Sequence, residues 1–102
     1  MSLINLSMKH NTTLAEAEAQ LAETVATVEK QFGSFVHTVE WDRDRRGVKF
    51  TGPGAWVTMK VDAEHVHAAG DIPVVSRLLG GAAKKMLEGT IKKQFPKALP
   101  EK

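Results

Sequence analysis

Hydrophobic and polar residues alternate along several short stretches of the chain. Between Leu3 and Met8, apolar Ile4, Leu6 and Met8 are separated by polar residues. A period of two residues is typical of a β-strand with one buried face. The same period predicts four further strands, which run from Phe35 to Trp41, Val48 to Phe50, Ala55 to Val61 and His65 to Ala68.

Two longer stretches instead have the period of an α-helix. Thr13 and Glu16 match the S/T-x-x-E capping box, and an apolar stripe follows as far as Phe32. We expect Gly33 to end this helix in the left-handed conformation. A second helix is predicted from about Val74 to Phe95. Gly80-Gly81 and Gly89 lie within this helix and are poor helix formers. They favour either a bend in the helix or a close approach of its backbone to another group, and the sequence does not distinguish the two.

The order of these elements, β-α-β-β-β-β-α, predicts an α+β protein. Each strand has one apolar face, so we expect a two-layer sandwich in which an antiparallel sheet of four to five strands carries both helices on one face. A meander of strands two to five, closed by strand one, gives the order 2-3-4-5-1. We interpret residues 1–102 as one domain, since a chain of this length buries a single core.

Composition narrows the classes of function. The 102 residues include no cysteine, which excludes disulfides, thiolate catalysis and cysteine-ligated metals. No apolar run approaches the ~20 residues of a membrane span, and acidic residues within the first 30 are unlike a targeting signal. We therefore expect a cytoplasmic protein without a transmembrane segment.

Histidines are the first candidates for chemistry. His65 and His67 lie two apart on a predicted strand, so both rings point to one side, where Asp62 or Glu64 could join them around a metal. No third ligand has a definite spacing, and solvated histidines on the outer face of the sheet are the favoured interpretation. The sequence thus predicts no metal site and no cofactor.

His37 shares its predicted strand face with Phe35, Val39 and Trp41, which predicts a buried polar side chain. A buried imidazole needs a hydrogen-bond partner and can act as a general base. No serine, cysteine or paired carboxylate can be placed beside it from the sequence. We therefore expect no catalytic residues and no enzyme, with His37 as a core or rim histidine bonded to the backbone.

Positive charge is concentrated near the C-terminus. Residues 72–102 carry seven basic and two acidic side chains, a net charge of +5 within a total of +2. A basic amphipathic helix of this kind either presents a solvated face or meets an anionic surface.

Trp56 and Val36, on the polar face of the sheet, form a small apolar patch that could support a homodimer. Nucleic acid is not an expected partner, because Trp56 alone is a plausible exposed stacking aromatic.

These observations predict a binding surface made of exposed apolar and basic side chains. Its members are Trp56, Leu79, Lys84, Lys85, Met86, Leu87, Lys92 and Lys93.

Scattered positions from Ile4 to Phe95 resemble the polyhydroxyalkanoic acid system family of small bacterial proteins. They include Lys9-His10 after the first strand, the Leu14 helix start, Trp41 before a charged turn, and Leu78-Leu79 before the last helix. Pro73 and Gly80-Gly81 depart from the family pattern. The resemblance implies a non-enzymatic accessory protein at or near storage-polyester granules, with the granule surface or granule proteins as partners. It transfers no active-site residues.

Two other functions remain open at this point. The first is a carrier of small hydrophobic ligands, with a cavity between a curved sheet and a long C-terminal helix, as in helix-grip proteins. Short strands enclose little volume, which counts against it. The second is an enzyme that uses His37.

Overall fold

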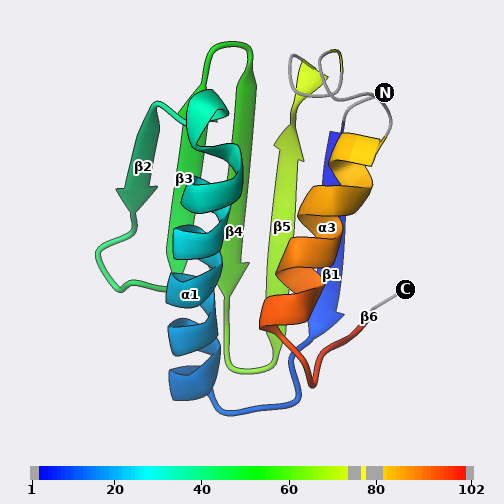
Figure 1. Ribbon diagram of the computed structural model, residues 1–102. Helices are drawn as coiled ribbons and strands as arrows, with labels where there is room; N and C mark the ends of the chain where they lie inside the picture. Colours follow the sequence, from blue (N-terminus) through cyan, green and yellow to red (C-terminus); the bar gives the residue numbers. More distant parts are fainter. Residues whose placement is uncertain (1–2, 74–76, 78–81, 101–102) are drawn as a thin grey trace.

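A computed structural model describes residues 3–73, 77 and 82–100. Strands and helices follow each other along the chain as the sequence predicts (Figure 1). They are β1 (Leu3–Lys9), α1 (Leu14–Phe32), the 3-10 helix η1 (Gly33–Phe35), β2 (Thr38–Trp41), β3 (Gly47–Gly52), β4 (Ala55–Val61), β5 (His65–Asp71), α3 (Ala82–Gln94) and β6 (Leu99–Pro100).

The strands form one antiparallel sheet in the order β2-β3-β4-β5-β1-β6. The predicted order 2-3-4-5-1 is confirmed, and so is the α+β class. Strand β6, which the sequence analysis did not predict, adds two residues beside the end of β1, where Lys9 pairs with Leu99. Helices α1 and α3 lie on the same face of the sheet (Figure 1).

Helix α1 begins where its cap predicts. The amide N–H of Glu16 donates to the Thr13 hydroxyl over 3.1 Å, while the Glu16 carboxylate accepts from Thr12 instead of completing the capping box. The expected left-handed end is wrong, since Gly33 has φ −55° and the chain continues into η1. An αR glycine prolongs the helical path by one tighter turn.

Helix α3 covers the second half of the predicted C-terminal helix. The first half, including Leu79 and Gly80-Gly81, lies outside the described residues apart from Arg77. Buried Ala83, Leu87 and Ile91 face inward from α3. Two polar contacts also join the helices, from the Thr90 hydroxyl to the side chain of Gln31 at 2.8 Å and from Gln94 to Thr27 at 3.3 Å.

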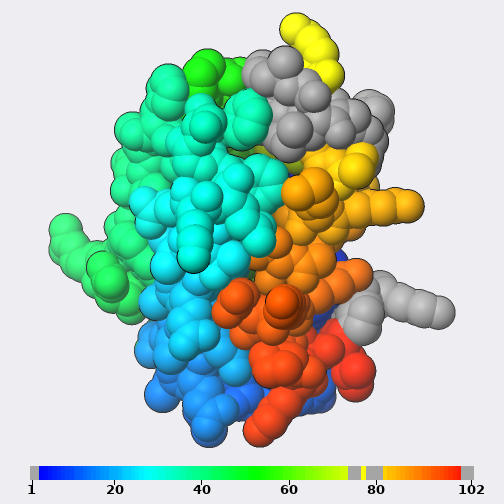
Figure 2. Space-filling model, viewed as in Figure 1, coloured from blue at the N-terminus to red at the C-terminus, as the bar shows by residue number. Residues whose placement is uncertain are grey.

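The hydrophobic core fills the space between the sheet and the two helices. Figure 2 shows α1 and α3 packed side by side over this core. Strands alternate as predicted, with one set of side chains buried and the other turned to the open face. The buried apolar set includes Ile4, Met8, Leu21, Val28, Phe50, Met59, Val66, Ala68, Ile91 and Phe95.

Strand β2 is shorter than the sequence predicts, because the chain before it approaches β3 closely. A Cβ atom built on Gly52 would lie 1.8 Å from the carbonyl oxygen of Phe35. Only glycine allows this approach, and the segment Gly33–Phe35 forms a 3-10 helix there. Regular pairing therefore starts at Thr38. The prediction of a strand from Phe35 is wrong by three residues.

Candidate functional site

His37 does not occupy the buried position that the sequence predicts. It precedes β2 and is exposed, and its backbone N–H donates to the carbonyl of Thr51 over 2.8 Å. The period-two argument fails here because η1 interrupts the strand. The prediction of a buried polar site at His37 is therefore wrong.

The buried histidine is His10, which is 1% exposed. Its Nδ1 accepts the Thr12 amide N–H at 3.2 Å, and its Nε2 lies 2.8 Å from the carbonyl oxygen of Asp62. This geometry fits the neutral ring with its proton on Nε2, which donates to Asp62. His10 is not among the site residues predicted from the sequence, although it continues the inward alternation of Ile4, Leu6 and Met8.

The predicted binding residues of α3 divide between solvent and core. Lys84, Lys85, Lys92 and Lys93 are exposed, and so is Met86. Leu87 is buried at 6% exposure and belongs to the core. The apolar side of α3 is therefore occupied by the protein's own core, which corrects the placement of Leu87 on a binding surface.

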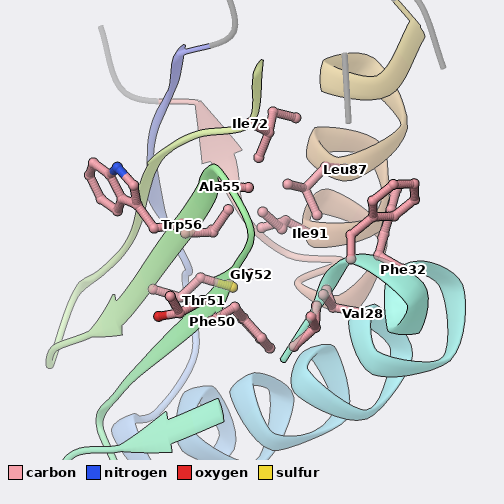
Figure 3. A pocket seen from close by; sticks show the side chains of 14 residues that line it. Val28, Phe32, Phe50, Thr51, Gly52, Ala55, Trp56, Ile72, Leu87 and Ile91 are labelled. Atoms are coloured by element: carbon pink, nitrogen blue, oxygen red, sulfur yellow. The ribbon is translucent and has the colours of Figure 1, made fainter. Parts of the chain in front are cut away.

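Trp56 is exposed, but on the other side of the molecule. It belongs to the outward set of β4, and Figure 3 shows its ring on the side of the sheet away from the helices. Trp56 and the lysines of α3 thus do not form one continuous surface. Trp56 pairs with Asp71, which pairs with Leu3 on the far side. Directly paired residues project to the same face, so Trp56 and Leu3 flank Asp71 on the outer face.

Leu3 and Trp56 are large apolar side chains that the fold leaves open. Their exposed fractions are 49% and 43%. Trp56 was predicted from the sequence as a binding residue and Leu3 was not, although the alternation around Ile4 places Leu3 on the outer face. We call these two residues, with Asp71 between them, the outer apolar row.

An apolar cavity lies between the sheet and the helices. Figure 3 shows Val28 of α1, Phe50 of β3, and Leu87 and Ile91 of α3 gathered around it. Its volume is about 40 Å³. A pocket for a drug-sized ligand needs about 300 Å³ or more. The cavity has room for a short alkyl group at most.

A cluster of one carboxylate and two imidazoles lies on the outer face at the start of β5. The side chains of Asp62, His65 and His67 bring ligand atoms within 4.8 Å of one another. The prediction that both histidines share one side is confirmed by their stacked rings, whose centroids are 5.7 Å apart. Hydrogen bonds from the backbone N–H groups of Glu64 and His65 lower the pKa of Asp62, and the two imidazoles add to the effect.

Among residues 3–73, 77 and 82–100, no helix has the length and apolar character needed to cross a bilayer. The described fold defines a class of small two-layer α+β protein with one covered and one open sheet face. The chain matches the model of the family described as "Putative polyhydroxyalkanoic acid system protein" over residues 4–99, and it belongs to that family. No curated protein and no solved structure gives a significant match.

Proposed function

We propose that the protein is a cytoplasmic accessory protein of the polyhydroxyalkanoate storage system, acting at or near the granule surface without catalysis. The observation that carries this proposal is the family match over residues 4–99, which spans nearly the whole sandwich, including the open sheet face. The fold is compatible with such contact, because the apolar side chains of the outer apolar row are exposed to solvent.

We infer that the outer apolar row is the part of the surface that contacts an apolar polyester. Leu3 on β1 and Trp56 on β4 lie on either side of β5, with which both strands pair, and both side chains remain about half exposed. Burial of apolar area stabilises association by about 25 cal/mol per Å², and a tryptophan supplies more such area than any other side chain. The apolar side of α3 is less suited, because it packs against the core.

Two observations support a role without catalysis. His10, the buried histidine of the described residues, uses both ring nitrogens in hydrogen bonds to the backbone, so neither is available to a substrate. Buried Thr24 likewise donates to the carbonyl of Gln20 at 2.7 Å. A general base needs a nitrogen or oxygen within reach of the proton that it removes.

The alternative of a hydrophobic-ligand carrier rests on the apolar cavity. The lining of that cavity suits an alkyl group, but its volume of about 40 Å³ is far below what a drug-sized ligand fills. A carrier role would therefore require the helices to separate from the sheet on binding. That separation would expose the core.

Fluorescent fusions in polyester-accumulating cells test the proposal. We expect fluorescence at the inclusions, and we expect Trp56→Ala to lower the granule-bound fraction because it removes apolar contact area. Met86→Ala is the matched control, since Met86 is 51% exposed but lies on α3, across the molecule. Diffuse fluorescence in cells with visible inclusions would contradict the proposal.

Sedimentation separates direct from indirect contact. Purified protein is mixed with protein-free polyester particles and, in parallel, with native granules. Direct contact through the outer apolar row predicts that the protein pellets with both and that Trp56→Ala weakens both. Pelleting with native granules alone would indicate a granule protein as the partner.

A further inference from the structure

We propose that Asp62, His65 and His67 form a binding site for a divalent transition-metal ion on the outer face of the sheet. Asp62 lies in the turn after β4, and the two histidines lie on β5. The three residues offer one carboxylate oxygen and two imidazole nitrogens within 4.8 Å of one another. Imidazole and carboxylate together suit Zn²⁺ and its neighbours in the first transition row.

The distances between the donor atoms are close to those of a coordinated ion. Asp62 Oδ2 lies 3.7 Å from His67 Nε2, and Asp62 Oδ1 lies 3.6 Å from His65 Nδ1. Around a tetrahedral zinc with bonds of about 2.0–2.1 Å, two ligand atoms are roughly 3.3–3.4 Å apart. These two pairs exceed that separation by a few tenths of an ångström, and they involve different oxygens of the Asp62 carboxylate. One ligand atom from each of the three residues lies within 4.8 Å of the others, so the side chains must rotate inward to surround one ion.

The turn that carries Asp62 is fixed without any ion. Asp62 Oδ1 accepts the backbone N–H groups of Glu64 and His65 at 2.9 and 2.6 Å. On the inner side, the Asp62 carbonyl is held by buried His10. Little ordering remains for the ion to impose, which favours binding.

His67 is oriented by a hydroxyl on the neighbouring strand. The Oγ atom of Ser7 lies 2.5 Å from His67 Nδ1, and Ser7 is the residue paired with His67 across β1 and β5. Metal-bound histidines almost always donate their second ring N–H to an acceptor such as a carboxylate, a backbone carbonyl or water, and the Ser7 hydroxyl oxygen takes that place here. When Nδ1–H donates to Ser7, Nε2 is left as the acceptor on the side of Asp62, where the ion would sit.

Two lysines share this part of the outer face and oppose a cation. Lys9 pairs with His65, and Lys60 pairs with His67. Both are exposed, so their long side chains can place the ammonium groups in solvent, where water and salt screen them. Repulsion of this kind lowers affinity for every divalent ion. Imidazole nitrogen then favours Zn²⁺, Ni²⁺ and Cu²⁺ over Mg²⁺ and Ca²⁺, which prefer oxygen ligands.

Calorimetric titration of the untagged full-length chain with ZnCl₂ tests the site. We expect saturable binding of one ion per chain, with MgCl₂ giving none. Removal of a ligand in His67→Ala or Asp62→Asn should weaken binding by at least about tenfold, and Ser7→Ala should weaken it less. His37→Ala is the matched control, because His37 is exposed and lies outside the cluster.

A second readout removes the ambiguity of a variant that fails to fold. Circular dichroism verifies that each variant is folded before titration. Zn²⁺ should also raise the melting temperature of the wild type and of His37→Ala but not that of His67→Ala. The proposal is overturned if folded wild-type protein shows no saturable binding, or if His67→Ala and His37→Ala bind Zn²⁺ equally well.

Discussion

The two faces of the sheet differ in how strongly packing restricts the types of residue that they carry. Along the strands the inner face is apolar, and Ile4, Met59 and Val66 are at most 2% exposed beneath the helices. The outer face combines hydroxyls, lysines and histidines with Leu3 and Trp56. Packing requires apolar side chains only on the inner face. Residues on the outer face are free of that requirement, so both candidate sites lie there.

The largest loss of stability should come from a substitution that creates a new cavity on the inner side of the sheet. Leu21 on α1 is fully buried, and Leu21→Ala should lower the free energy of unfolding by about 3 kcal/mol, since the core collapses only partly around the space left. Leu3→Ala makes the same change on the outer face, at a residue 49% exposed, and should cost less than about 1 kcal/mol. Urea unfolding of both variants measures the contrast. Equal losses would mean that Leu3 also contributes to the core.

The inner face was largely predictable from the sequence, and the outer face was not. Alternation and the helical period gave the fold class, the strand order and most core positions, because each depends on local spacing. The apolar stripe of α3 was also visible. Spacing alone could not show that this stripe faces the protein's own core and leaves little for a partner, since either surface satisfies the same pattern.

Both errors about histidines have a tertiary cause. His37 is exposed because Gly52 admits the backbone of Phe35 and interrupts the strand, a contact between residues 17 positions apart that no local period encodes. His10 is buried because the turn after β4 supplies its hydrogen-bond acceptor. That turn also brings Asp62 to His65 and His67, which is why a third ligand could not be assigned from spacing.

An intermediate loss of stability is expected when His10, a polar side chain buried on the inner side of the sheet, is removed. His10→Ala removes a buried ring and leaves the Asp62 carbonyl and the Thr12 amide without their partner, so we expect a loss of about 2 kcal/mol. His37→Ala removes an exposed ring and should stay within about 0.5 kcal/mol of the wild type. Chemical denaturation at neutral pH compares the two. If His37→Ala costs as much as His10→Ala, the assigned burial of the two histidines is wrong.

The smallest effect should arise on the outer face, from the charge of Asp62. Its pKa is lowered in the folded protein by the amides of Glu64 and His65, so ionised Asp62 stabilises the fold. This contribution is complete above the unfolded pKa of about 3.9 and is lost as the pH falls from there through the lower folded pKa. Because Asp62 is exposed and screened, we expect Asp62→Asn to cost only a few tenths of a kcal/mol.

Unfolding of wild type and Asp62→Asn in a metal chelator, at about pH 7 and about pH 3, measures this contribution apart from any bound ion. The difference between them should be present at the higher pH and shrink at the lower one. A difference that stays the same at both pH values would show that the asparagine acts through its shape, and that the charge of Asp62 contributes nothing to the turn. In that case the turn at Asp62 would be held by its backbone hydrogen bonds and by His10 on the inner side, whether or not residue 62 is charged.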